Sequence, residues 1–331
     1  GQTWTGQAYP TAQLYHITVT NHDPYWVCGA QQDNSTACMP SRNPGGVLAP
    51  HFAVGGGESG YIASDPENPD IIFAGSYGGL LTRFDARTGE RWTINVWPDN
   101  PMGHSAGELR ERFQWTFPIM FSKAGPKRLY VASQHLWVTT DEGRSWDRIS
   151  GDLTRADPRT MGPSGGPITR DQTSVEYYAT IFAVEPSPHD GNTIWVGSDD
   201  GLVHVTRDHG RNWTNITPRD MPANTRVSII EESPHRPGAV YVAAKRYQMN
   251  DRKPYIWYTE DYGRTWRRID RGIPEGAYVH AVREDPVRSG MLFAGTELGV
   301  FISLDNGASW ANFNRNLPVT QVPNLMVKGN D

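Results

Sequence analysis

Four short segments of this chain repeat one pattern, and that repeat limits the possible fold more than any other feature. Each has Ser or Thr, then Asp two positions later, Gly after two more, and finally Ser, Thr or Asn followed by Trp. The segments are Thr139–Trp146, Thr206–Trp213, Thr259–Trp266 and Ser303–Trp310. A repeat at regular intervals indicates an array of similar structural units.

The residue types of the repeat are those of a tight turn between two strands. An Asp carboxylate accepts backbone N–H groups in such turns, Gly adopts a positive φ at little cost, and Trp packs a large apolar face against a neighbour. The pattern resembles the Asp box, or bacterial-neuraminidase (BNR) repeat. We therefore expect structural roles for Asp141, Asp208, Asp261 and Asp305.

Each box ends a longer unit of β-like segments. Two hydrophobic strands precede the second box, Thr193–Ser198 and Leu202–Thr206, and a further strand precedes them. Units of this kind are expected to begin near Tyr15, Tyr61, Pro118, Ile181, Val227 and Val279. The sequence therefore predicts an all-β, seven-bladed Asp-box β-propeller whose blades have strands A to D, with the box on the C–D turn. A β-sandwich is the alternative.

The two ends suggest how the ring closes. Gly1–Trp4 has the second half of a box, and Pro323–Lys328 has the pattern of a strand A. We interpret these as parts of one closing blade, added to six complete blades. On this interpretation residues 1–331 form a single propeller domain, truncated at both ends from a longer chain.

Composition and motifs argue against several function classes. The net charge is −5 without a run of Lys or Arg, so nucleic acid is not an expected partner. No stretch approaches the roughly 18 apolar residues of a membrane span. Cys-x-x-Cys, His-Glu-x-x-His and P-loop motifs are absent from the sequence, so no metal or cofactor is expected.

The two cysteines are predicted to form a disulfide. If Tyr25–Ala30 and Ser35–Met39 pair as a hairpin centred on Asp33, Cys28 and Cys38 lie opposite each other. Opposed Cα atoms are about 4.5–5.5 Å apart, within disulfide range. Two buried thiols are the alternative. A disulfide predicts a secreted or periplasmic protein.

Several further segments resemble one known group of proteins. They are Gln31–Ser35, Gly55–Tyr61, Phe113–Phe117, Gly162–Ile168, Ser174–Tyr178 and Val282–Pro286. With the boxes, they make the chain similar to the second propeller of large bacterial sortilin-like or "glycosyl hydrolase, repeat-containing" proteins. The resemblance implies an N-terminal propeller in the same parent chain as a partner, and it supplies no catalytic residues.

By analogy with other propellers of this kind, the ligand face is formed by the D–A and B–C connections. Three of these connections are long, Met39–Gly60, Thr93–Trp115 and Asp147–Ala179, and long loops tend to be functional. The candidate ligand-binding residues on this face are Asp33, Glu58, Arg112, Glu176, Tyr178, Asp199, Asp200, Arg226 and Arg246. An internal ion-pair network that holds the loops is the alternative for these charges.

Three functions are compatible with this arrangement. Binding of a polar ligand, a carbohydrate or a peptide, is the first. A glycoside hydrolase is the second and would use two carboxylates about 5–9.5 Å apart. A structural or assembly subunit is the third and would need only the outer surface.

Overall fold

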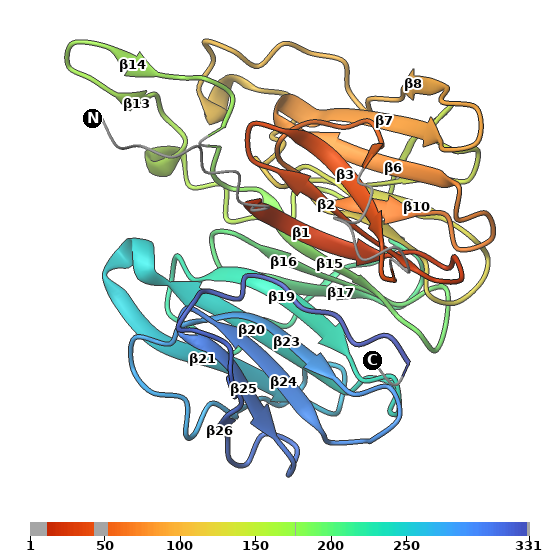
Figure 1. Cartoon of the computed structure of the whole chain (residues 1–331). Coiled ribbons are helices and arrows are strands. Elements are labelled where there is room, and N and C mark those ends of the chain that lie inside the picture. The colour runs from red at the N-terminus through yellow and green to blue at the C-terminus, as the bar shows by residue number, and fades with distance from the viewer. Residues whose placement is uncertain (1–11, 43–51, 176, 330–331) are drawn as a thin grey trace, which may run out of the picture.

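The computed structural model describes residues 12–42, 52–175 and 177–329, and the backbone there forms six four-stranded antiparallel sheets in succession (Figure 1). In each sheet the strands are paired in chain order. The first three sheets consist of β1 (Leu14–Val19), β2 (Trp26–Gln31), β3 (Ser35–Pro40) and β4 (Phe52–Ala53), then β5 (Ile62–Ser64), β6 (Ile71–Ser76), β7 (Leu80–Asp85) and β8 (Arg91–Thr93), then β9 (Ile119–Phe121), β10 (Leu129–Ala132), β11 (Leu136–Thr139) and β12 (Asp147–Arg148).

The other three sheets consist of β15 (Ile181–Pro186), β16 (Ile194–Ser198), β17 (Val203–Thr206) and β18 (Thr214–Asn215), then β19 (Arg226–Glu232), β20 (Val240–Arg246), β21 (Asp251–Thr259) and β22 (Arg267–Arg268), then β23 (Val279–Glu284), β24 (Leu292–Thr296), β25 (Gly299–Ser303) and β26 (Ala311–Asn312). A separate hairpin of β13 (Ser164–Gly165) and β14 (Arg170–Asp171) lies in the longest connection. The first strand of each sheet contacts the first strand of the next, from β1 through β5, β9, β15 and β19 to β23. This is a β-propeller, and the prediction of six complete blades is confirmed.

The core lies between neighbouring sheets. Each buried cluster joins two of them; one, for example, combines Tyr241 and Tyr258 of the fifth sheet with Phe301 and Trp310 of the sixth. Strands β6, β15 and β16 are buried along their whole length. Because both faces of an inner sheet are covered, these strands are apolar or small throughout except at Glu185 of β15, rather than alternating.

The box tryptophans connect each sheet to the one before it. The indole Nε1 of Trp146 donates to the carbonyl of Ile94 at 3.1 Å, and that of Trp213 donates to the carbonyl of Ile149 at 3.0 Å. Trp266 and Trp310 make the same bond to Ile216 and Ile269. Each acceptor directly follows the outermost strand of its sheet, so the bond repeats around the ring.

The box aspartates are engaged within their own turns. Asp141 Oδ1 accepts the backbone N–H of Ser145 at 3.0 Å, and its Oδ2 accepts the Ser145 hydroxyl at 2.6 Å. Asp208, Asp261 and Asp305 accept the equivalent pairs of bonds from Asn212, Thr265 and Ser309. The hydrogen bonds from Ser145 lower the pKa of Asp141 to about 2. These contacts fit the expected structural role.

Cys28 and Cys38 are bonded to each other, as predicted. They are directly opposed in the β2–β3 pair, and their Cα atoms are 4.0 Å apart. Both side chains are fully buried against the second sheet.

The predicted strand at Pro323–Lys328 is not confirmed, because the backbone there pairs with no strand in the described part of the chain. Side chains hold the segment instead. Arg283 Nε donates to the Leu325 carbonyl at 3.0 Å, and Lys328 Nζ donates to the Thr20 carbonyl at 3.2 Å. The segment therefore runs between the sixth sheet and the first, as the dark blue trace in Figure 1 shows. The other half of the expected closing blade, Gly1–Trp4, lies outside the described residues.

Among the described residues, no helix has the length and apolar character required to cross a membrane.

Candidate functional site on the D–A/B–C face

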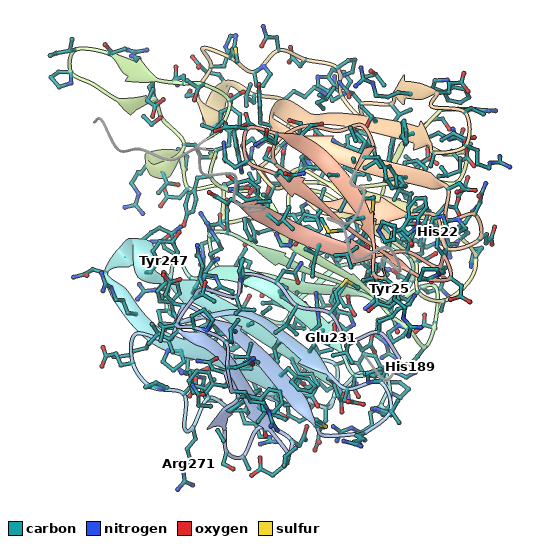
Figure 2. All side chains as sticks on the ribbon, in the orientation of Figure 1. His22, Tyr25, His189, Glu231, Tyr247 and Arg271 are labelled. Carbon is teal, nitrogen blue, oxygen red and sulfur yellow. A yellow bond between two sulfur atoms is a disulfide. The ribbon has the colours of Figure 1, made fainter. Side chains whose placement is uncertain are left out.

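The two edges of the ring differ in their connections. Tyr247, in the η4 turn (Tyr247–Met249) between β20 and β21, lies at the edge with the D–A and B–C connections (Figure 2). His22 and His189, from A–B turns, lie at the opposite edge of the same view. The long loops Thr93–Trp115 and Asp147–Ala179 join one sheet to the next at the edge of Tyr247. They carry additional elements: η2 (Ala106–Glu108), η3 (Pro158–Thr160) and the β13–β14 hairpin. The prediction of a third such loop over Met39–Gly60 is wrong, because β4 lies within it and only the segment between β4 and β5 joins the first sheet to the second.

An open cleft of about 790 Å³ lies on this face above the first two sheets. Its lining comes from the β2–β3 turn, the loop before β5, the η1 turn (Tyr77–Gly79) and the loop after β8. Polar groups on the lining include Asp33, Glu58, Asn95, Asp99 and Asn100. A polar cleft of this size is suitable for a sugar chain or a peptide segment.

Asp33 and Glu58, both predicted from the sequence, meet in this cleft. Gln32 Nε2 donates to Asp33 Oδ1 at 2.9 Å and to Glu58 Oε2 at 2.8 Å. Glu58 Oε2 also accepts the backbone N–H of Asp33 at 3.1 Å. The two carboxylates therefore accept from the same amide nitrogen and lie next to each other in the cleft.

Tyr77 lines the cleft and belongs to a group of three contacting aromatic rings. Tyr77 and Trp115 stack with centroids 5.3 Å apart and an interplanar angle of 8°. Tyr15 contacts Trp115 edge to face, and its hydroxyl donates to Gln32 Oε1. The carboxylate pair and the aromatic rings are therefore parts of one hydrogen-bonded and stacked arrangement.

A second, smaller pocket of about 200 Å³ lies at the ring axis on the other side of Trp115. We call it the axial pocket, because its lining comes mostly from the innermost strands of several sheets. The lining residues are Tyr15, His16, Gln114, Trp115, Thr116, Phe182, Arg226, Ser228, Lys245, His280 and Pro323. It includes two cations, Arg226 and Lys245.

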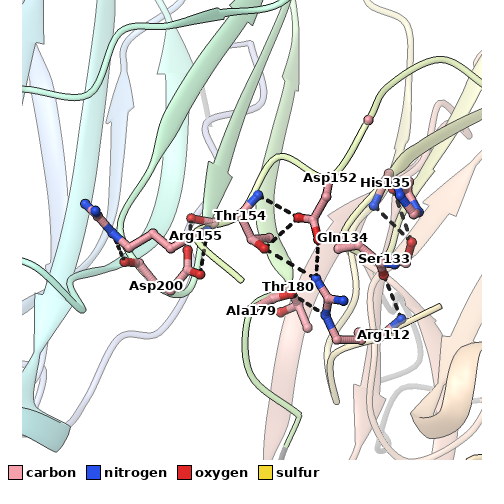
Figure 3. A network of polar contacts seen from close by, with 12 residues as sticks. Arg112, Ser133, Gln134, His135, Asp152, Thr154, Arg155, Ala179, Thr180 and Asp200 are labelled. Atoms are coloured by element: carbon pink, nitrogen blue, oxygen red, sulfur yellow. Dashed lines mark hydrogen bonds and ion pairs between the residues drawn. The ribbon is translucent and has the colours of Figure 1, made fainter. Parts of the chain in front are cut away.

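Arg112 does not face either cavity. It is buried, with Nε donating to the Ala179 carbonyl at 2.9 Å and Nη2 donating to Asp152 Oδ2 at 2.6 Å (Figure 3). Its backbone N–H donates to Gln134 Oε1 at 2.8 Å. Arg112 thus fastens both ends of the longest loop to the third sheet, as the alternative of an internal network expects.

Asp199 and Asp200 are also buried and engaged. Asp199 accepts the backbone N–H and the hydroxyl of Thr180 at 2.9 and 2.8 Å, and burial raises its pKa to about 7. Asp200 Oδ2 accepts the backbone N–H of Arg155 at 2.8 Å, which ties the same loop to the fourth sheet (Figure 3). The geometry therefore does not favour Asp199 and Asp200 as ligand contacts.

Tyr178, Arg226 and Arg246 are in separate surroundings. Tyr178 donates to Asn224 Oδ1 at 3.0 Å, and burial raises its pKa to about 12. Arg246 is ion-paired with Asp251 at 2.8 Å. Arg226 lines the axial pocket. Glu176 lies outside the described residues.

Sequence reasoning missed Trp115 and Lys245 as site residues. Phe113 and Phe117 are buried, whereas Trp115 between them is only partly buried and reaches the axial pocket. The available signal for Trp115 was a large aromatic residue in a long connection of this face. Lys245 had no comparable signal, because a single Lys at the end of a strand is commonly a surface residue.

Within the described ranges, no group of three or more His, Cys, Asp or Glu side chains is arranged to hold a metal ion.

Comparisons with known proteins agree with the fold. No known family profile matches the chain. A probable oligoxyloglucan-reducing end-specific xyloglucanase of Neosartorya fischeri is 23% identical over 228 residues, which are 65% of this chain and 24% of that protein.

Among solved structures, the GH74 xyloglucanase of Xanthomonas campestris superposes with a TM-score of 0.58 at 18% identity, covering 86% of this chain and 45% of that one. YCF48 from Cyanidioschyzon merolae gives a TM-score of 0.60 at 14% identity, covering 94% of this chain and 88% of that one. The chain shares the β-propeller fold of these proteins. It spans less than half of the xyloglucanases it matches.

Proposed function

We propose that this propeller is a carbohydrate-active domain of the glycoside hydrolase type, which binds an oligosaccharide in the cleft on its D–A/B–C face. The main support is the pairing of Asp33 and Glu58 beside the aromatic ring of Tyr77. Carboxylates bind sugar hydroxyls, and an aromatic face packs against the apolar face of a sugar ring. The similarity to xyloglucanases adds support for a carbohydrate as the ligand.

The chemistry available to this pair is hydrolysis of a glycosidic bond. One carboxyl group protonates the leaving oxygen, while the other, as carboxylate, takes a proton from the attacking water or attacks the anomeric carbon itself. Water then supplies the hydroxyl group of the new reducing end. In this proposal Glu58 and Asp33 share these two roles.

Titration with a xyloglucan heptasaccharide tests the binding step. Tyr77→Ala removes an aromatic face from the cleft and is expected to weaken binding about tenfold. Leu304→Ala is the control, since this residue is 75% exposed on a box turn at the opposite edge. Absence of heptasaccharide binding by the unaltered chain, or equal affinity of the Tyr77 variant, would contradict the proposal.

The closing blade is also a proposal. Phe313 follows β26 in the position that Ile269 has after β22, and its N–H donates to Val300 O as that of Ile269 donates to Ile256 O. In the described part of the chain, no donor is bonded to the Phe313 carbonyl. A groove of about 610 Å³ lined by Phe293, Val300 and Phe313 lies beside it. We propose that the indole ring of Trp4 occupies this groove and donates to the Phe313 carbonyl, as the other box tryptophans donate to the preceding sheet.

A secreted or periplasmic location belongs to the same proposal. The buried Cys28–Cys38 disulfide supports it, because such bonds persist in oxidising compartments.

A further inference from the structure

Arg226 and Lys245 occupy directly opposed positions on β19 and β20. Both side chains line the axial pocket. Like charges placed directly opposite each other on neighbouring strands destabilise a sheet. The repulsion between these two cations therefore lowers the stability of the sheet, and a bound anion would remove that repulsion.

No carboxylate of the described residues forms an ion pair with either cation. Arg226 lies over the ring of Phe182, with its guanidinium carbon 4.9 Å from the ring centroid, and its Nη1 and Nη2 donate to the neutral side-chain amide oxygen of Gln248 at 3.1 Å. Lys245 Nζ is 3.0 Å from His280 Nδ1, and His280 Nε2 is 3.0 Å from Glu297 Oε2. Because the ammonium group can only donate, His280 accepts at Nδ1 and donates from Nε2 to Glu297.

We propose that the axial pocket binds the carboxylate of an acidic sugar, a uronic acid residue of the oligosaccharide in the neighbouring cleft. Arg226 and Lys245 are the two donors to that carboxylate. A guanidinium group and an ammonium group give charge-assisted hydrogen bonds of the strong class. This inference rests on the proposed function and specifies its substrate class.

The position of the pocket favours a sugar as the source of the carboxylate. Trp115 and Tyr15 line the pocket, and Trp115 stacks on Tyr77, which lines the cleft. A volume of about 200 Å³ is enough for one sugar residue. The aromatic rings offer stacking surfaces along the path from the cleft to the two cations.

Carboxylate binding is expected to tighten as the pH falls through 7. Burial and the charge of Arg226 lower the pKa of Lys245 to about 7, so the cation is gained as the pH falls from 8 to 6. The other titratable or charged groups around Lys245 are Arg226, His280, Glu297, His16 and Tyr247. Burial lowers the pKa of His280 to about 4 and that of His16 to about 3, so both stay neutral over this range.

The test compares methyl β-D-glucuronide with methyl β-D-glucoside by calorimetric titration of the full chain. We expect the glucuronide to bind at least about tenfold more tightly, since the glucoside lacks the carboxylate. We also expect its affinity to rise about five- to tenfold from pH 8 to pH 6. Equal affinities for the two sugars would overturn the inference, as would tighter binding of N-acetylalanine, a peptide-like carboxylate.

Variants identify the donors. Arg226→Gln and Lys245→Met should each abolish the preference for the glucuronide, while Arg226→Lys should retain part of it. Arg271→Gln is the matched control, because this exposed arginine projects away from the ring (Figure 2). Thermal melts exclude misfolding, since removing one of two opposed cations should not lower the melting temperature. Unchanged preference in Arg226→Gln would contradict the assignment.

The test of the acidic pocket can fail independently of the test of the cleft. Binding of the neutral xyloglucan heptasaccharide without any preference for the glucuronide would leave the cleft proposal intact and refute the acidic pocket. Loss of heptasaccharide binding alone would refute the cleft proposal.

Discussion

Asp199 is a carboxylate buried in the fourth sheet without an ion-pair partner among the described residues. Two hydrogen bonds from Thr180 and the charge of Arg226 favour its ionised form, yet burial outweighs them and raises the pKa to about 7. A carboxyl group whose pKa is higher in the folded chain than in the unfolded chain stabilises the fold at low pH. That contribution is lost as the pH rises through the folded pKa.

Asp199→Asn should remove this pH dependence. The melting temperature of the unaltered chain is expected to fall relative to that of the variant as the pH rises from 4 to 8. Glu185, whose pKa burial also raises to about 7, titrates in both proteins, so its contribution cancels from the difference. A constant difference in melting temperature between pH 4 and pH 8 would show that Asp199 does not titrate there.

At the scale of elements, the box glycines determine how closely neighbouring sheets approach. A Cβ on Gly210 would lie 2.3 Å from the Ile149 carbonyl oxygen of the preceding sheet. A Cβ on Gly143, Gly263 or Gly307 would instead lie 2.5–2.6 Å from the Cδ1 atom of the corresponding isoleucine. The conserved geometry of these contacts around the ring explains why the box includes Gly at this position.

Gly210→Ala and Gly103→Ala separate this contact from backbone strain. Both glycines have φ of +86°, but a Cβ on Gly103 would meet no atom within 4 Å. Gly210→Ala is therefore expected to lower the free energy of unfolding by about 1–3 kcal/mol more than Gly103→Ala, measured by urea denaturation. Equal losses of unfolding free energy in the two variants would mean that the contact between Gly210 and Ile149 does not limit how closely the sheets approach.

The strands were predictable from sequence because each one is short, apolar and bounded by turn residues, and because the boxes set their spacing. Predicted starts such as Tyr61 and Val279 agree with β5 and β23 to within one residue. Outer strand β4 was missed, since Phe52–Ala53 has no box before it. The segment at Pro323 lacks a ladder because no partner strand lies beside it in the described chain.

The candidate site was predictable only in part, because sequence patterns do not show which charges face each other. Asp33 and Glu58 meet in an open cleft, whereas Arg112 and Asp200 are used to hold a loop. All four have the same sequence signature, a charged residue in a connection of the same face. The partners of these charges distinguish the two roles. Gln32 joins Asp33 and Glu58 in the cleft, whereas Asp152 and Arg155 are the loop partners of Arg112 and Asp200.

At the scale of the whole molecule, the proposed closing blade predicts equal effects of two substitutions. Trp213→Phe removes the hydrogen bond to Ile149 O and should lower the free energy of unfolding by about 1 kcal/mol. If Trp4 donates to Phe313 O in the same way, Trp4→Phe should have a similar effect. No loss of stability in the Trp4 variant, alongside a loss in the Trp213 variant, would contradict closure by this residue.

The central claim, a carbohydrate-active cleft on one face of the propeller, is tested most directly by hydrolysis of xyloglucan oligosaccharides. The release of reducing ends is compared among the unaltered chain, Glu58→Gln, Asp33→Asn and the control Glu90→Gln, an exposed residue of the β7–β8 connection. The account predicts hydrolysis by the unaltered chain and the control, and a loss of about 10²–10⁴-fold in each of the other two variants. Hydrolysis that persists unchanged in both variants, or bound oligosaccharide that the unaltered chain never cleaves, would contradict it.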